Sequence, residues 1–211
     1  MGSKKVLIFD FDGTLINSGL SIYKILKKIT VKFGNQNIDI SDEDKFRDMS
    51  SREIVKGLFK NRFILYPLAP LTYLRFRYEY SKNIKELKPV PGIKEVLDEL
   101  EKKGISMYIV SSSPKWNIKR FIREHDMEDF KLIEVVLGFF GKHIAIKRIL
   151  KKEKLNPENV IYIGDETRDI ESAHRAGVKS AAVTWGVNSK KVLEKYNPDY
   201  LITKPEELLL L

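Results

Sequence analysis

The chain contains no cysteine, and this absence excludes several kinds of chemistry at once. Disulfide bonds, thiolate metal sites and a cysteine nucleophile all require that residue. Histidine is also scarce: the chain holds three, scattered without the spacing of a metal site, namely His125, His143 and His174. We therefore expect any metal ion to be held by oxygen ligands.

Long apolar runs are missing as well. None approaches the length of a membrane span, and "MGSKKVLIFDFDG" brings charge into its apolar segment too early for a signal peptide. We therefore expect a cytoplasmic protein that makes no membrane contact. The 211 residues, with 32% charged and 43% hydrophobic, are typical of one globular domain, or of a domain that carries a smaller insert.

The net charge of +9 is unevenly distributed along the chain. Residues 17–88 hold fifteen basic and eight acidic residues, so this segment alone carries +7. Two interpretations stay open: the segment faces an anion, or it forms a solvated, lysine-rich helical surface. The alternation of aromatic and charged residues over 73–82 favours a half-buried helix, so nucleic-acid binding is not expected.

From Pro89 onward, predicted strands alternate with predicted helices. The strands, beginning with the apolar run Val6–Phe9, are predicted at 6–9, 105–110, 131–139, 160–164, 180–186 and 198–202. The helices are predicted at 91–103, 114–126, 143–155, 168–177 and 205–211. Strands separated by helices imply right-handed crossovers, so the fold class is α/β, with a Rossmann-like, doubly wound parallel sheet.

Residues 17–88 interrupt this alternation. Three segments, 19–34, 41–61 and 67–87, have the period of helices, and no strand is predicted between them. An all-helical insert directly after the first strand indicates a cap over the ends of the strands. We therefore expect a core domain of residues 1–16 and 89–211 and a helical cap domain of residues 17–88.

Two aspartates, Asp10 and Asp12, follow the first apolar run. Residues two apart on a strand point to the same side, so these carboxylates could share one small site. Like charges at that range cost energy unless a cation or a shared proton offsets them.

Polar side chains follow several other predicted strands at the same edge of the sheet, where open α/β sheets bind ligands. They are Thr14, Ser111, Ser112, Ser113, Lys142, Asp165 and Asp169, and Gly13 lies beside Thr14 in the same loop. Carboxylates without cysteine or histidine suit Mg²⁺, which keeps several waters and binds substrate phosphate. The convergence of carboxylates, a hydroxyl and one ammonium therefore predicts a site for phosphoryl transfer.

Four motifs, taken in order, resemble those of the haloacid dehalogenase superfamily. They are "DFDGT" at 10–14, a serine that closes an apolar strand at Ser111, Lys142 before a helix, and "GDETRD" at 164–169. The resemblance covers residues 4–16 and 89–205. The dehalogenases of the superfamily lack an acid at the position of Asp12, so a phosphate-processing member is favoured. The insert resembles the small helical cap of the phosphoglycolate phosphatase and phosphoglucomutase branches.

The resemblance implies a catalytic role for each of four residues. Asp10 would be the nucleophile that becomes phosphorylated. Asp12 would be the general acid that protonates the leaving oxygen, and later the base that activates water. Ser111 would donate a hydrogen bond to the phosphoryl oxygens, and Lys142 would neutralise Asp10 and the transferring group.

The resemblance also implies ligands for Mg²⁺ and for the substrate. The metal ligands would be Asp10, Asp165, the backbone carbonyl of Asp12, and Asp169 directly or through water. Gly13, Thr14, Ser112 and Arg52 would bind substrate, with Arg47 a further candidate, whereas Ser113 is expected to be structural. Two positions depart from the family pattern: Asp48 stands where glycine is common, and Glu166 where a small residue is commoner.

The leading hypothesis is a Mg²⁺-dependent hydrolase of a small phosphorylated metabolite that forms an aspartyl phosphate. A phosphosugar mutase of the β-phosphoglucomutase type shares every core residue and stays open as an alternative. A phospho-receiver that signals through its aspartyl phosphate is a less favoured one. The sequence does not determine the substrate, nor whether the protein is a monomer or a dimer.

Overall fold

The computed structural model describes residues 5–32, 42–58, 69–127, 130–136 and 141–211. Its centre is a six-stranded sheet in the order β3-β2-β1-β4-β5-β6, in which every neighbouring pair is parallel. The strands are β1 (Val6–Phe9), β2 (Ser106–Ser111), β3 (Phe130–Val135), β4 (Val160–Gly164), β5 (Lys179–Val183) and β6 (Tyr200–Ile202). The predicted α/β fold with a doubly wound parallel sheet is therefore confirmed.

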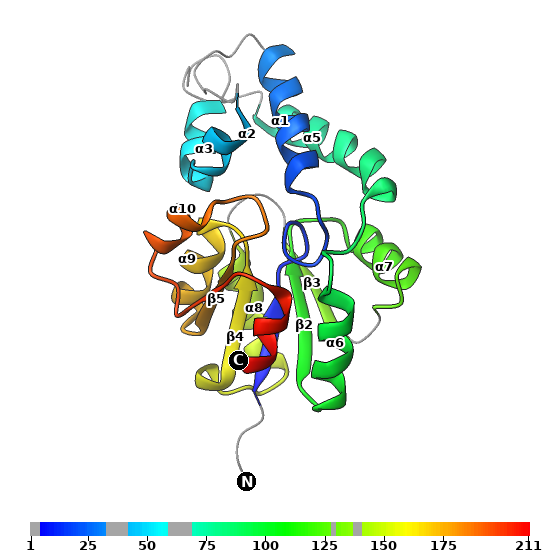
Figure 1. Ribbon diagram of the computed structural model, residues 1–211, viewed down its shortest axis with the longest axis vertical. Helices are drawn as coiled ribbons and strands as arrows, with labels where there is room; N and C mark the ends of the chain where they lie inside the picture. The colour runs from blue at the N-terminus through cyan, green and yellow to red at the C-terminus, as the bar shows by residue number, and fades with distance from the viewer. Residues whose placement is uncertain (1–4, 33–41, 59–68, 128–129, 137–140) are drawn as a thin grey trace.

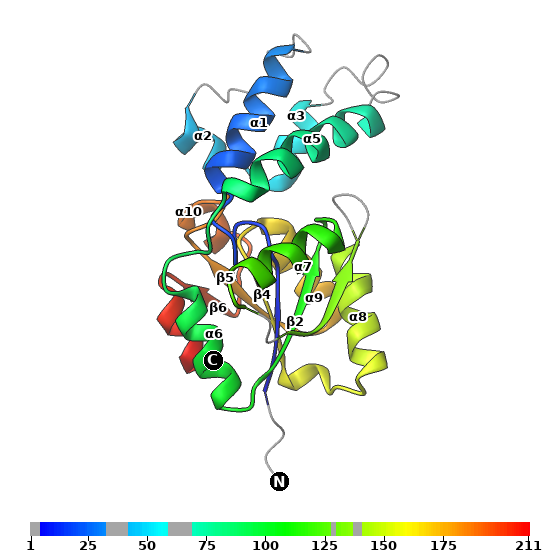
Figure 2. The ribbon, with the colours of Figure 1, turned by 90° about the vertical axis from the view of Figure 1, so that its right-hand side faces the viewer.

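Helices cover both faces of this sheet (Figure 2). They are α6 (Ile93–Lys102), α7 (Lys115–Glu124), α8 (Lys142–Lys152), α9 (Thr167–Ala176) and the short α10 (Lys190–Glu194). The central strand β1 is apolar throughout because its side chains alternate between two cores. Leu7 and Phe9 pack in the cluster that includes α6 and α7, whereas Val6 and Ile8 pack in the one that includes α8 and α9.

Short 3₁₀ helices complete the described part of this core: η2 (Pro157–Asn159) and η3 (Pro205–Leu210). The helix predicted over 205–211 is present as a 3₁₀ helix, the tighter form that is common in short terminal segments. Its Leu208 is buried against the α6 side of the core.

The helices of residues 17–88 lie beyond the carboxyl ends of the strands (Figure 1). They are α1 (Gly19–Lys32), α2 (Glu43–Arg47), α3 (Ser51–Leu58), α5 (Ala69–Asn83) and the 3₁₀ helix η1 (Ile84–Glu86). The two segments that join them to the sheet lie side by side, since the Asn17 N–H donates to the Lys88 carbonyl at 2.9 Å and the Val90 N–H to the Leu15 carbonyl at 2.9 Å. We keep the term cap for residues 17–88.

The single helix predicted over 41–61 is two helices in the structure, so this prediction was wrong. The helical period spans both, but Ser50 begins a new helix with a capping box. Its backbone N–H and its hydroxyl donate to the Glu53 carboxylate at 2.8 and 2.7 Å, and the Glu53 N–H donates back to the Ser50 hydroxyl at 3.3 Å. Residues 33–34, 41, 59–61, 67–68 and 137–139 of the predicted elements lie outside the described residues.

Within the described ranges, no helix combines the length and the apolar character that crossing a membrane requires.

Candidate active site

The chain leaves β1 at Asp10, whose carboxylate is buried at the centre of the sheet edge. Its Oδ1 accepts a hydrogen bond from the Phe11 N–H at 2.7 Å, and its Oδ2 lies 2.5 Å from Lys142 Nζ. Lys142, at the first position of α8, also reaches Asp169 Oδ1 at 2.6 Å. One buried ammonium therefore bridges two buried carboxylates that come from β1 and α9.

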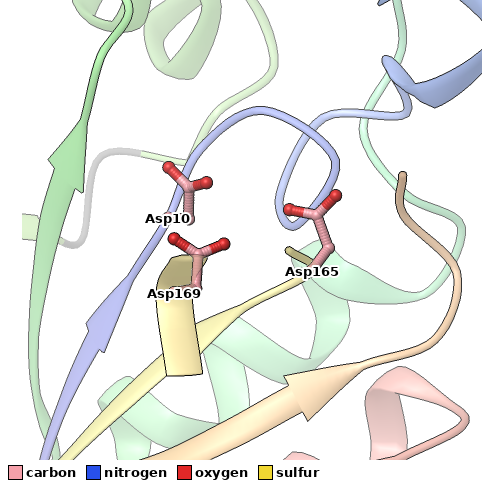
Figure 3. A group of neighbouring side chains, drawn as sticks. All are labelled: Asp10, Asp165 and Asp169. Carbon is pink, nitrogen blue, oxygen red and sulfur yellow. The ribbon is translucent and has the colours of Figure 1, made fainter. Parts of the chain in front are cut away.

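A third carboxylate, that of Asp165, completes the group (Figure 3). One oxygen each of Asp10, Asp165 and Asp169 lies within 4.8 Å of the others. The three residues follow β1 or β4, which are neighbours in the sheet and mark the point where the strand order reverses. We call Asp10, Asp165 and Asp169 the carboxylate cluster.

The side chain of Asp165 is held by hydrogen bonds and by the close approach of two loops. Its Oδ1 accepts from the Thr14 hydroxyl at 3.1 Å and its Oδ2 from the Val187 N–H at 2.7 Å. Gly13 has φ +76° and passes so close that a Cβ there would lie 2.1 Å from Asp165 Oδ2. A Cβ on Gly186 would likewise lie 2.2 Å from the Cβ of Asp165. Both glycines are thus required by the close approach of the backbone to this carboxylate.

Burial governs the protonation of the carboxylate cluster. It raises the pKa of Asp10 to about 7, although the Lys142 ammonium opposes the rise and Asp169 adds to it. Burial also raises the pKa of Asp165 well above its ordinary value, helped by the nearby charges of Glu166 and Asp169. For Lys142, burial lowers the pKa, but Asp10 and Asp169 more than offset this and hold it above the usual range.

The donor set of the carboxylate cluster fits a divalent cation. Three buried carboxylates face a single ammonium, so the fully ionised group carries excess negative charge that burial makes costly. A cation would offset that charge, and ligands made only of oxygen suit a hard ion such as Mg²⁺.

Asp12 does not belong to this cluster, because its side chain turns toward the cap. Its Oδ1 accepts from the hydroxyl of Tyr80 in α5, and its Oδ2 accepts from the hydroxyls of Ser113 at 2.7 Å and Ser111 at 3.3 Å. Burial raises the pKa of Asp12, whereas the hydrogen bonds from Tyr80 and Ser113 oppose the rise. Asp10 and Asp12, two positions apart, therefore lie in different surroundings: Asp10 contacts Lys142 and Asp12 contacts Tyr80 and Ser113.

A pocket between cap and core lies against Asp12. It is lined by cap residues Ile22, Leu26, Phe46, Ser51, Ile54, Tyr73, Phe76, Arg77 and Tyr80, and by core residues Asp12, Ser112, Ser113, Pro114, Glu166, Arg168 and Val187. Its cavity volume is about 80 Å³. The lining is mainly apolar, with two arginines among its charged groups.

Some of the predicted substrate ligands line the pocket, and others lie outside it. Ser112 lines the pocket, whereas Thr14 and Gly13 support Asp165. Arg52 is not part of the pocket lining, and its exposed guanidinium pairs with Glu171 at 2.9 Å.

Arg47 is also turned away from the pocket, because it donates to the Thr184 carbonyl at 3.1 Å. Glu166, a departure from the family pattern, links cap and core. It accepts from the Ser51 hydroxyl at 2.8 Å and pairs with Arg168.

Sequence reasoning missed Tyr80, Arg77 and Arg168, and it assigned Ser113 a structural role although its hydroxyl contacts Asp12. One pattern could have found the cap residues. Positions 73, 76, 77 and 80 recur at helical spacing in α5, and they form the face that lines the pocket.

Residues 7–183 match the sequence profile of the haloacid dehalogenase-like hydrolase family. The chain belongs to this family. Membership confirms the resemblance carried by the four motifs, and it identifies the protein as an enzyme of the hydrolase class.

Two curated relatives of this hydrolase are similar over nearly the whole chain. Phosphoglycolate phosphatase from Synechococcus elongatus is 32% identical over 210 residues, which cover 97% of this chain and 95% of the relative. Pyrophosphatase PpaX from Bacillus anthracis is 24% identical over 219 residues, covering 97% and 94%. The crystal structure of "a predicted phosphatase" from Clostridium acetobutylicum superposes with a TM-score of 0.79 at 22% identity, over 99% of both chains, and supports the fold.

Proposed function

We propose that this hydrolase is a Mg²⁺-dependent phosphomonoesterase that acts on a small phosphorylated metabolite through a phosphorylated Asp10. The observation that carries the proposal is the contact of Asp10 with Lys142 inside the carboxylate cluster, at the edge where such sheets bind ligands. A phosphoryl group brings negative charge that the ammonium and a divalent cation would balance.

In the first step, a carboxylate oxygen of Asp10 attacks phosphorus and the bond from phosphorus to the leaving oxygen breaks. Asp12 donates a proton to that oxygen. Two features support these roles: Asp10 is held by Lys142, and Asp12 lines the pocket in which a leaving group would lie.

In the second step, water attacks phosphorus, the bond between phosphorus and Asp10 breaks, and Asp12 accepts the proton from water. Inorganic phosphate leaves and the Asp10 carboxylate is regenerated. Ser111, whose buried hydroxyl lies beside Asp12, would donate to a phosphoryl oxygen, and Lys142 would stabilise charge in both steps.

Asp10, Asp165 and Asp169 would hold Mg²⁺, with the backbone carbonyl of Asp12 as a further ligand. The bound ion would supply charge stabilisation for the phosphoryl group. The cluster's oxygen donors and their burial support this assignment.

The pocket supports a small leaving group. Its volume of about 80 Å³ is several times the roughly 10–15 Å³ that a cavity needs to hold a single water molecule. A leaving group of only a few non-hydrogen atoms would fill it.

Arg77 supports a substrate with a second anionic group. Its half-buried guanidinium lies 5.6 Å from the centroid of the Tyr73 ring, and among the described residues it forms no ion pair or hydrogen bond. The pocket's other arginine, Arg168, is already paired with Glu166. Phosphoglycolate and pyrophosphate, for which the two relatives are named, each carry a second anionic group.

The proposed function is tested by measuring phosphate release from a panel of phosphorylated metabolites, with Mg²⁺ and with a chelator. The panel includes 2-phosphoglycolate, pyrophosphate and hexose phosphates. We expect release that requires Mg²⁺ and is abolished in Asp10→Asn. An isomerised hexose phosphate without free phosphate would overturn the hydrolase in favour of the mutase. Phosphate release that persists without Mg²⁺ or in Asp10→Asn would overturn the mechanism.

The role of Arg77 is tested by comparing 2-phosphoglycolate with ethyl phosphate, which lacks the carboxylate. Arg77→Ala should raise KM for 2-phosphoglycolate about tenfold or more and leave KM for ethyl phosphate nearly unchanged, because an ion-pair hydrogen bond is worth about 1.5–3 kcal/mol. Arg52→Ala is the matched control, since this cap arginine is paired elsewhere. An equal change for both substrates would exclude recognition of the second anion by Arg77.

A further inference from the structure

Tyr80 is a buried cap residue whose hydroxyl reaches the catalytic loop of the core. It lies in α5, only 4% exposed, and donates to Asp12 Oδ1 across 68 positions of sequence. The Tyr80 ring stacks on Phe76, with ring centroids 6.0 Å apart and planes 6° from parallel. The neighbouring Ser81 hydroxyl accepts from the Asn117 side-chain amide of α7 at 3.3 Å. This part of α5 therefore rests on the core through two polar contacts.

Both carboxylate oxygens of Asp12 are held by hydroxyl groups from different parts of the fold. The Tyr80 hydroxyl donates to Oδ1 from the cap, and the Ser113 hydroxyl donates to Oδ2 from the core at 2.7 Å. These two hydrogen bonds hold the carboxylate toward the pocket, whose lining includes Asp12.

We propose that Tyr80 is a positioning residue of the cap, which orients the Asp12 carboxyl toward the leaving oxygen of the substrate. The proposal rests on the proposed function, in which Asp12 transfers the proton. Tyr80 itself touches neither the phosphoryl group nor the cation in this scheme. Because the hydroxyl comes from the cap, the orientation of the acid depends on how α5 packs over the core.

This role makes a distinctive demand on the substrate. An alkoxide leaving group needs a proton as the bond to phosphorus breaks, whereas an acetate leaving group does not. The leaving groups of ethyl phosphate and acetyl phosphate differ in size by one oxygen atom, so they fit the pocket similarly. They differ mainly in whether the leaving oxygen needs a proton. Disturbing the position of Asp12 should therefore slow the first reaction and spare the second.

The experiment compares kcat/KM of wild type and Tyr80→Phe, with Mg²⁺ present, on 2-phosphoglycolate, ethyl phosphate and acetyl phosphate. The value of kcat/KM depends on the steps from substrate binding through release of the leaving group. It does not depend on the later hydrolysis of the aspartyl phosphate. Phenylalanine keeps the ring that stacks on Phe76 and removes only the hydroxyl. We expect kcat/KM to fall about tenfold or more for the two alkyl phosphates and less than twofold for acetyl phosphate, since full general acid catalysis contributes about 10²–10⁴.

Two further variants sharpen the comparison. Tyr78→Phe removes the same hydroxyl from an exposed position of α5 and should change none of the three values. Ser113→Ala removes another donor to Asp12 and should reproduce the selective loss, which keeps the inference testable if Tyr80→Phe does not fold. In an Asp12→Asn background, Tyr80→Phe should add no further loss on alkyl phosphates, because the two residues act as one unit.

The outcomes separate this inference from the proposed function. If wild type releases phosphate and Tyr80→Phe lowers all three values equally, or none of them, the positioning role is overturned while the phosphatase stands. If wild type releases phosphate from no member of the panel, the proposed function fails first. A selective loss in Tyr80→Phe that persists unchanged in size on top of Asp12→Asn would also overturn the inference, because the hydroxyl would then act independently of Asp12.

Discussion

In the absence of a divalent cation, Asp10 should destabilise the folded protein progressively as pH rises from about 4 to about 7. Its pKa is raised from an ordinary value of 3.8 to about 7 because burial penalises the charged carboxylate. A raised pKa means that folding favours the neutral acid. The stabilising contribution is therefore fully present below pH 3.8 and is lost as pH rises through the folded-state value.

The size of the effect follows from this difference in pKa. Each pKa unit corresponds to about 1.4 kcal/mol, so the rise from 3.8 to about 7 corresponds to about 4 kcal/mol of unfolding free energy. In a protein of this size, a loss of 1 kcal/mol lowers Tm by about 2–4 °C. The contribution of Asp10 is thus about 8–16 °C between pH 4 and pH 8.

The assay is thermal or urea unfolding at several pH values in the presence of a chelator, for wild type and Asp10→Asn. Other carboxylates titrate over the same range, and the difference between the two proteins isolates Asp10. We expect wild type to lose stability relative to Asp10→Asn as pH rises. Saturating Mg²⁺ should stabilise wild type strongly at pH 8, because an ion that binds only the folded state stabilises it by mass action.

Two results would refute this reasoning. A difference between wild type and Asp10→Asn that stays constant from pH 4 to pH 8 would mean that Asp10 ionises without cost in the fold. Equal stabilisation of both proteins by Mg²⁺ would mean that the ion does not use the Asp10 charge.

Three further substitutions follow from the contacts of the site. Gly13→Ala places a Cβ 2.1 Å from Asp165 Oδ2 at a φ of +76°, so it should abolish phosphate release and lower Tm, and wild-type activity would contradict the close approach. Lys142→Met removes the buried ammonium, so kcat should fall about 10³-fold or more by phosphate assay; a change confined to KM would disprove a role in stabilising transferred charge. Ser50→Ala removes the hydroxyl of a capping box and should cost about 1 kcal/mol in urea unfolding; an unchanged midpoint would show that α3 does not need this cap.

Much of the core could be predicted because its determinants are local. The runs Val6–Phe9 and Val160–Gly164 are apolar throughout, as parallel strands with both faces covered must be. In a parallel sheet, residues that follow neighbouring strands meet at one edge, so Asp10 and Asp165 could be expected together from the sequence alone. Lys142 was expected at the same edge because it follows the third predicted strand, and the structure places it 2.5 Å from Asp10.

The cap was harder to predict because its pattern is ambiguous. The helical period runs through 41–61 without interruption, yet the Ser50 capping box divides it into α2 and α3. The resemblance to the family's cap pointed to Arg52 as a substrate ligand. Its partner Glu171 lies in α9, far along the chain, and no local pattern indicates that pairing.

The sequence by itself determined which chemical groups lie at the sheet edge, because strand periodicity and loop glycines act over a few residues. Only the tertiary structure decided which way each group faces. Asp10 and Asp12 are two positions apart, yet the first contacts Lys142 and the second contacts Tyr80 of α5. That separation depends on how α5 packs over the strand ends. Helical spacing marks the face of α5 that packs, but the partner of that face is determined by contacts between residues distant in sequence.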